Sequence, residues 1–332
     1  MEAGLPPGVA TGIGSLPHRE PDAAVEFVLR TTPQLPYVPT LPRFHPAEGM
    51  LAQLAVGVPG VGIDEGGALV IRPDRVRIDA VSADLEHPAY GGLRAFLAAA
   101  KGRRGAVKWQ ITGPLTFGVA LAAGGVEPEL AFDVAQQAVA VHGAAIAASL
   151  RDAMPEGTQT VFLDEPSFAS VMEPQFPLAP DIAIDLVSGS LADLQRSAAV
   201  GVHCCGAGDW AAILATGPAV LSLPVQPGLA RVTGYLSSFL EAGGRIAWGV
   251  VATDSPVGVS PDRYWENLVR LWCELVQAGC DAVALRTQAL VTPACGLALH
   301  DEAQAERIAE LVQRVADRVH GQAVATRLSL GA

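Results

Sequence analysis

Short apolar runs alternate with longer helical patterns along almost the whole chain of 332 residues. Repeated strand–helix units of this kind are typical of a parallel sheet whose strands are connected by helices. About eight runs are long enough to be strands, at residues 9–14, 37–41, 107–112, 160–163, 200–205, 219–223, 245–252 and 289–292. In a chain of this length they predict an α/β fold of the (β/α)8 TIM-barrel class, as a single domain over residues 1–332.

The alternative is an open doubly wound sheet, which at this length would more often divide into two domains. No shift in composition marks a linker between two such domains. One segment departs from the alternation, because residues 68–80 carry apolar residues on both sides of Pro73-Asp74. We expect a small hairpin insertion there, beside the barrel.

The charge of the chain argues against one class of partner. Its formal net charge is -12, from 34 acidic and 22 basic residues that are scattered along the sequence. Without a basic stripe to neutralise phosphates, nucleic acid is not expected as a partner. The first residues show no signal peptide, and the Ala-rich stretch at 131–150 carries too many polar residues to span a bilayer. We therefore expect a soluble, cytoplasmic protein without a membrane partner.

Polar and sulfur-bearing residues stand at or just past the ends of the predicted strands. In a parallel barrel the carboxyl ends of all strands share one face, where active sites of this fold are built. The residues concerned are Ser15, Thr112, Asp164, His203, Cys205, Asp254 and Cys295. Their common position predicts an active site on that rim.

The pair His203 and Cys205 indicates a metal site. Side chains two apart on a strand point to the same face, so these two can converge on one ion while Cys204 points away. Cys295 lies in a Pro-Ala-Cys-Gly turn after the last predicted strand. Five cysteines, an odd number without an export signal, favour free thiols or metal ligands over disulfides. One imidazole and two thiolates suit zinc.

Two further positions are candidates for binding a small substrate. Asp164 and Glu165 are adjacent, so only one can enter the barrel mouth, and we expect that one to be Asp164. The backbone amides of Gly14 and Ser15 can hold a small carboxylate. The pattern Gly12-Ile13-Gly14 is not a dinucleotide fingerprint, since the third glycine and the downstream acid are missing.

The ordered set of motifs resembles a known family. It consists of Ile13-Gly14-Ser15-Leu16-Pro17, Thr112-Gly113-Pro114-Leu115-Thr116, Asp164-Glu165-Pro166, His203-x-Cys205, Asp254-Ser255-Pro256 and Pro293-x-Cys295-Gly296-Leu297. In order and spacing, from about residue 10 to 300, it is similar to the catalytic C-terminal barrel of cobalamin-independent methionine synthase. That barrel shares its (β/α)8 fold with uroporphyrinogen decarboxylase.

The resemblance implies roles for individual residues. His203, Cys205 and Cys295 would bind zinc, the turn at Gly14 and Ser15 would bind the homocysteine carboxylate, and Asp164 would bind its amino group. The chain would then be a zinc-dependent S-methyltransferase that moves a methyl group to the thiol of homocysteine and gives methionine.

The sequence also departs from the family at several positions. A glutamate that ligates zinc in the family is matched by Pro224, which leaves Gln226, Asp209 or a water as a fourth ligand. The catalytic histidine is matched by Asp254, so a carboxyl group would assist proton delivery. A second homocysteine-binding glutamate has no counterpart near Leu41-Pro42-Arg43.

The family's N-terminal barrel has no counterpart in this sequence, and with it part of the methyl-folate site is missing. The methyl donor is therefore either methyl-folate or a methyl-corrinoid, the latter carried on a corrinoid protein as partner. Two other functions stay open. One is another zinc-dependent thiol alkyltransferase, and the other is a uroporphyrinogen decarboxylase-like barrel without the metal.

Overall fold

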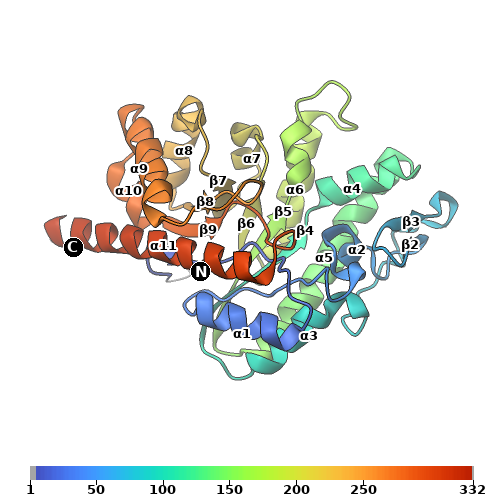
Figure 1. Cartoon of the computed structure of the whole chain (residues 1–332). Coiled ribbons are helices and arrows are strands. Elements are labelled where there is room, and N and C mark those ends of the chain that lie inside the picture. The colour runs from blue at the N-terminus through green and yellow to red at the C-terminus, as the bar shows by residue number, and fades with distance from the viewer. Residues whose placement is uncertain (1–4, 331–332) are drawn as a thin grey trace.

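The structure, a computed structural model that describes residues 5–330, is built around one parallel sheet of seven strands. In sheet order the strands are β1 (Val9–Ala10), β9 (Ala289–Pro293), β8 (Arg245–Val251), β7 (Val220–Pro224), β6 (Ala199–His203), β5 (Gly157–Asp164) and β4 (Gly105–Thr112). Every neighbouring pair is parallel. The sheet is curled and helices surround it, which confirms the predicted α/β class (Figure 1).

Helices follow the strands, and five of the eleven in the described residues begin at proline. Their bounds are α1 (Pro21–Thr31), α2 (Met50–Ala55), α3 (Gly91–Ala99), α4 (Pro114–Ala123), α5 (Pro128–Ala153), α6 (Pro180–Leu194), α7 (Trp210–Ala215), α8 (Thr233–Glu241), α9 (Pro261–Gln277), α10 (Ala282–Thr287) and α11 (Glu302–Leu330). Short 3-10 helices lie at Pro46–Glu48, Pro73–Arg75, Pro88–Tyr90, Pro166–Ser170 and Leu229–Val232. Proline suits a first helical turn because its missing N–H has no partner there anyway.

The second predicted strand, at residues 37–41, is not a regular strand. It joins both edges of the sheet by isolated parallel bridges, from Tyr37 to Lys108 of β4 and from Thr40 to Ser15 just past β1. The Val38 N–H donates to the Lys108 carbonyl at 2.9 Å, and the Thr40 N–H donates to the Gly14 carbonyl at 3.1 Å. Prolines at 36, 39 and 42 lack an N–H, so a continuous ladder cannot form here.

The hairpin insertion exists, but its predicted position is wrong. It is formed by two antiparallel strands, β2 (Val61–Ile63) and β3 (Leu69–Ile71). The turn between them is set by Asp64, whose Oδ1 accepts the N–H groups of Gly66 at 2.9 Å and Ala68 at 2.8 Å. Pro73 begins a 3-10 helix instead of the expected hairpin turn, because its fixed φ favours a helical turn.

Apolar side chains are buried on both faces of the sheet. The large core lies between the sheet and the surrounding helices. A second, smaller cluster contains no helix residue and fills the inner face near the amino ends of the strands; it consists of Leu5, Val9, Leu35, Phe162, Val220, Ala247 and Leu290. The space inside the curled sheet is therefore closed by packed side chains at this end.

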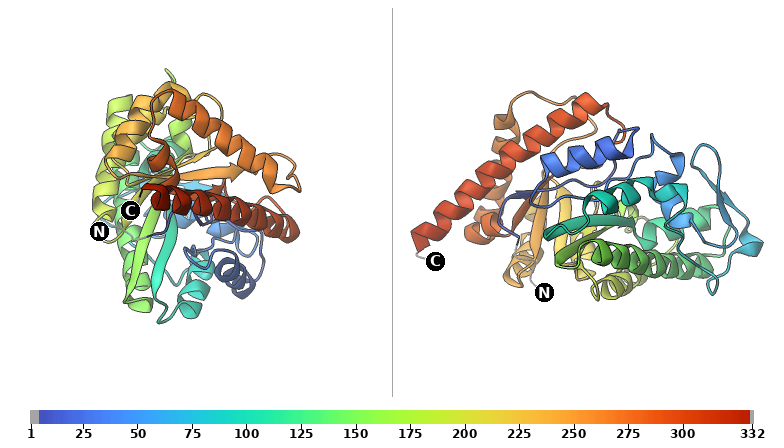
Figure 2. Two further views of the ribbon diagram at one scale, coloured as in Figure 1. Left: turned by 90° about the vertical axis from the view of Figure 1, so that its left-hand side faces the viewer. Right: turned by 90° about the horizontal axis from the view of Figure 1, so that it is seen from below.

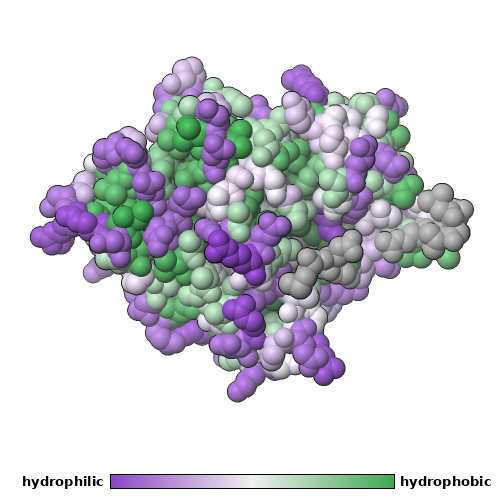
Figure 3. All heavy atoms as spheres, turned by 180° about the vertical axis from the view of Figure 1, so that it is seen from behind, coloured by the Kyte–Doolittle hydropathy of each residue, from purple (hydrophilic) through white to green (hydrophobic). Residues whose placement is uncertain are grey.

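Helix α11 runs across β1 and β9 and lies beside α1 (Figure 2). Arg30 of α1 donates to both carboxylate oxygens of Glu306, at 2.6 and 2.8 Å. Seen from behind, the surface mixes hydrophilic and hydrophobic residues (Figure 3).

Helix α5 is the one described helix that is long and apolar enough to cross a membrane. The sequence argument that polar residues rule this out is therefore too strict. Of its most apolar window, 56% is buried inside the structure. The core helix of a soluble protein passes the same test.

Glu165 ties β5 to the start of α4. Its side chain is fully buried and faces away from the barrel mouth, accepting the Leu115 N–H at 2.8 Å, the Thr116 N–H at 2.8 Å and the Thr116 hydroxyl at 2.5 Å. Burial raises the pKa of Glu165 to about 7, and the hydrogen bonds oppose that rise. A carboxylate at a helix N-terminus also interacts favourably with the helix dipole. A Cβ at Gly113 would lie 2.1 Å from Glu165 Oε1, so the contact requires glycine.

Two glycine-to-alanine changes should therefore have opposite effects on stability. Gly113→Ala should lower the free energy of unfolding by about 1–3 kcal/mol, because the methyl group overlaps the Glu165 carboxylate. Gly234→Ala in α8, where nothing lies within 4 Å of the added Cβ, should raise it by about 0.5–1 kcal/mol. Urea denaturation of both variants measures the difference. Equal stability of the two would contradict the assigned contact.

Candidate metal centre

The ends of β6 and β9 bring three candidate ligands together. His203 is the last residue of β6, Cys205 follows it, and Cys295 follows Pro293 at the end of β9. One ligand atom from each residue lies within 4.8 Å of the others. His203 is 3% exposed, Cys295 is half-buried and Cys205 is exposed, so the cluster opens to solvent at the carboxyl ends of the strands.

The ring of His203 is held in an orientation that suits a metal ligand. Its Nδ1 lies 3.0 Å from the Ser222 hydroxyl, on the neighbouring residue of β7. Its Nε2 is buried and has no hydrogen-bond partner among the described residues. An Nδ1–H that donates to a hydroxyl leaves the Nε2 lone pair free, which is the usual arrangement of a ligating histidine.

The two thiols share one environment. The neighbouring Cys295 and then His203 lower the pKa of the Cys205 thiol, and Cys205 in turn raises the pKa of Cys295. The thiolate is the form of cysteine that binds a metal. With His203 Nε2 unpaired, this donor set fits a zinc ion.

A fourth protein ligand does not join the cluster among the described residues. Pro224 ends β7 two residues after Ser222 and offers no donor. Asp209 caps α7, where its carboxylate accepts the Ala212 N–H at 2.9 Å. Three protein ligands with an open fourth position are typical of catalytic rather than structural zinc sites.

The predicted substrate-binding turn lies against the loop that carries Cys295. The Leu297 N–H donates to the Ser15 carbonyl at 2.7 Å. A Cβ at Gly296 would lie 2.0 Å from Ser15 Oγ, and a Cβ at Gly14 would lie 2.3 Å from the Gln110 side chain. The two glycines thus allow the turn to pack between β4 and the Cys295 loop.

Asp164, the third predicted substrate-binding residue, ends β5 directly beside His203 in the sheet. It is half-buried, and its Oδ1 has no partner among the described residues. Burial raises the pKa of Asp164, whereas the charge of His203 opposes that rise. The unpaired oxygen is free to accept a hydrogen bond from a bound ligand.

Asp254, the predicted catalytic residue, is placed differently. It is exposed on the loop between β8 and α9. The described interactions of the cluster do not include it. The structure therefore brings the metal candidates together beside the substrate candidates, and none of the contacts among the described residues joins Asp254 to them.

Sequence reasoning missed three residues that support the site: Ser222, Lys108 and Gln110. A signal for the last two was present, because Lys108, Gln110 and Thr112 alternate with apolar residues along β4 and so share one face. Ser222 carried no such signal, since its contact with His203 depends on the register between β6 and β7.

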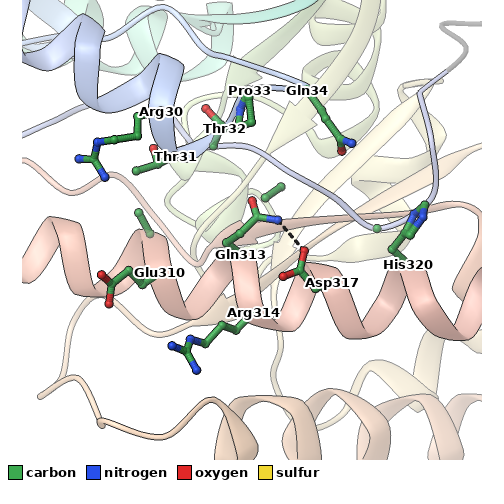
Figure 4. Close-up of a pocket in the computed structure, with 13 residues that line it drawn as sticks. Arg30, Thr31, Thr32, Pro33, Gln34, Glu310, Gln313, Arg314, Asp317 and His320 are labelled. Atoms are coloured by element: carbon green, nitrogen blue, oxygen red, sulfur yellow. Dashed lines mark hydrogen bonds between the residues drawn. The ribbon is translucent and has the colours of Figure 1, made fainter.

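A cavity of about 520 Å³ lies elsewhere, between the end of α1 and α11 (Figure 4). Thr32, Gln34, Gln313 and His320 are among its lining residues, and Gln313 donates to Asp317 at 2.8 Å. None of the candidate site residues lines it.

Comparison with solved structures identifies the fold. A B12-independent methionine synthase from Shewanella sp. W3-18-1, in complex with selenomethionine, matches with a TM-score of 0.62 and 13% identity. The match covers 96% of this chain and 99% of that one. The chain has the fold of the B12-independent methionine synthases.

A second structure supports the same fold. The putative vitamin-B12 independent methionine synthase from Listeria monocytogenes matches with a TM-score of 0.58 and 16% identity, over 90% of this chain and 86% of that one. No protein-family model and no curated protein sequence matches the chain. The similarity is thus found in the fold, and sequence identities of 13% and 16% do not by themselves establish a shared function.

The hydrogen bond between Ser222 and His203 should contribute to metal affinity. Ser222→Ala removes the group that orients the ring, so zinc should bind about 10- to 100-fold more weakly. Competition with a chromophoric chelator measures this affinity. Ser238→Ala, at an exposed position on α8, is the matched control and should bind zinc like the parent chain. Equal affinities of the two variants would show that Ser222 has no such role.

Proposed function

We propose that this chain is a zinc-dependent methyltransferase that transfers a methyl group to the thiol of homocysteine and gives methionine. The observation that carries the proposal is the convergence of His203, Cys205 and Cys295 within 4.8 Å at the carboxyl end of a parallel sheet. Active sites of (β/α)8 barrels lie at this end. We propose that residues 36–40 take the place of the eighth strand and complete such a barrel.

Zinc at this site would lower the pKa of a coordinated substrate thiol and so supply a sulfur nucleophile at neutral pH. His203, Cys205 and Cys295 would hold the ion, and their two thiolates balance its charge. Ser222 would hold the imidazole of His203 through Nδ1, which leaves Nε2 to face the ion.

The chain itself would orient the amino-acid part of homocysteine. The backbone amides at Gly14 and Ser15 would donate hydrogen bonds to the carboxylate. The unpaired Oδ1 of Asp164 would accept a hydrogen bond from the ammonium group. Holding both groups fixes the direction of the substrate sulfur toward the metal ligands. Such positioning is a large part of catalysis in a transfer between two bound reactants.

Asp254 would deliver or accept a proton on the donor side of the reaction. Its exposed position on the loop between β8 and α9 supports exchange of that proton with solvent. This loop follows the carboxyl end of β8, the end of the sheet from which we propose that the methyl donor approaches.

The methyl donor would be methyl-folate or a methyl-corrinoid. A methyl-corrinoid would come on a separate corrinoid protein, the partner that we propose for this case. The exposure of Cys205 supports access of a bulky donor from outside. The reaction would take place in the cytoplasm.

The names of the two similar structures agree with this proposal, since both are described as methionine synthases that do not depend on B12. Their likeness concerns the fold. The three candidate ligands and the unpaired Asp164 oxygen of this chain supply the chemical argument.

Removing the histidine ligand should abolish both metal binding and methyl transfer. His203→Ala should lose zinc on purification, as measured by metal analysis, and should form no methionine from homocysteine with either donor. Cys273→Ser is the matched control, because this exposed cysteine of α9 lies outside the cluster and should retain both properties. The zinc site would be refuted if the parent protein contained no zinc and the His203→Ala variant kept its activity.

Growth distinguishes the methionine assignment from other thiol alkylations. The chain should support a methionine auxotroph on homocysteine when the matching methyl donor is present. Supplying methyl-folate and methyl-corrinoid separately in the purified reaction identifies the donor. If a zinc-containing protein formed no methionine with either donor, homocysteine would be excluded as the acceptor and another thiol would take its place.

A further inference from the structure

Lys108 is a buried amine in the inner wall of the sheet. It lies in the middle of β4 and is 0% exposed. The chain contains only one other lysine, Lys101, which is exposed, while its remaining twenty basic residues are arginines. A lysine is almost never fully buried unless it is paired. Its position therefore requires an explanation.

The contacts of Lys108 lie on two sides of its ammonium group. Nζ donates to the Ile13 carbonyl and, at 3.0 Å, to Gln110 Oε1. It also lies 4.8 Å from the centre of the Phe162 ring, within the range of a cation–π interaction. None of the ion pairs among the described residues includes Lys108.

Stability alone is a poor reason to keep an ammonium at this position. Burial of a charge without a close counter-ion costs several kcal/mol, and a hydrophobic side chain of similar volume is often at least as stable. The surroundings of Nζ are one carbonyl, one amide and one ring, so the charge is only partly compensated. A role in the neighbouring site accounts for the choice.

Lys108 supports the turn that carries the proposed carboxylate-binding amides. Gly12 packs on the Tyr37 ring and Gly14 on the Gln110 side chain, at distances that leave no room for a Cβ. Between these glycines, the Ile13 carbonyl points to Lys108 Nζ. The side-chain nitrogen of Lys108 thus holds the turn at the Ile13 carbonyl, two residues before Ser15.

Burial lowers the pKa of Lys108 to about 7, and the charge of Asp164 opposes that fall. An amine and an ammonium group both carry N–H donors, so Nζ can donate to the Ile13 carbonyl in either state. The support of the turn therefore does not depend on the charge of Lys108.

We propose that Lys108 is a positioning residue of the candidate site: its Nζ holds the Ile13–Gly14 turn in place, so that the backbone amides of the turn recognise the carboxylate of the thiol substrate. The inference rests on the proposed function. It assigns Lys108 to the amino-acid part of the substrate, because the sulfur would bind at the metal site.

The test compares two thiols on the zinc-loaded full chain. Homocysteine carries the carboxylate and the ammonium, whereas 2-mercaptoethanol carries neither. Lys108→Met keeps an unbranched chain of similar length and removes the charge and the donor. It should raise the KM for homocysteine about 10- to 100-fold, as expected for a misplaced substrate, and leave the KM for 2-mercaptoethanol within about twofold.

Three measurements separate this role from a general loss of structure. Zinc affinity of Lys108→Met should be unchanged, and calorimetric titration should show weaker binding of homocysteine without any methyl donor. Lys101→Met, the exposed lysine, is the control and should behave like the parent chain. An equal loss for both thiols, or an unchanged preference for homocysteine, would overturn the proposal.

A variant that keeps part of the contact covers the case in which Lys108→Met does not fold, which circular dichroism reveals. Lys108→Gln keeps a polar side chain beside Gln110 but ends one atom short of the Ile13 carbonyl. It should also lose preference for homocysteine over 2-mercaptoethanol, and an unchanged preference would again overturn the proposal. Failure of the proposed function itself is recognised separately, because the parent chain would then bind zinc without binding homocysteine.

Discussion

The hydrogen bonds of residues 36–40 connect the two edges of the sheet, and the geometry of the candidate site depends on them. Three inter-strand spacings separate β6 from β9, so in a flat sheet the ligands at their ends would lie roughly 14 Å apart. The observed separation is at most 4.8 Å. The curvature of the sheet therefore brings the three candidate ligands together.

This closure is achieved with few backbone donors. Prolines at 36 and 39 leave Val38 and Thr40 to donate in opposite directions, one to β4 and one to the turn after β1. Lys108 adds a side-chain bond to Ile13 between them. The Lys108 side chain thus supplements the few backbone hydrogen bonds of residues 36–40. A regular strand at this place would pair through a full backbone ladder.

Much of this fold follows from the sequence, because apolar runs ending in Gly, Pro or acidic residues locate the strand ends. The predicted end of the third strand at Thr112 is the observed one, and β5 ends one residue beyond its predicted end at Leu163. Helix α4 was missed because its residues are apolar on all sides and show no helical period. Its start depends on Glu165, about fifty residues away in the chain.

The candidate site divides in the same way. Parity on one strand and a shared rim are local rules, and they bring His203, Cys205 and Cys295 together correctly in space. The partners of those residues follow from register and closure instead. Ser222 meets His203 only because β6 and β7 pair as they do, and the short run around Lys108 gives no hint that its partner is Ile13.

The small cluster on the inner face of the sheet has a consequence for how this molecule can change over evolutionary time. Its residues, Leu5 and Phe162 among them, close the interior near the amino ends of the strands. Cys205 and Cys295 stand beyond the opposite ends and belong to neither packed cluster. Folding and chemistry thus draw on different ends of the same strands. Residues at the carboxyl ends can diverge into new specificities while the closed end preserves the fold.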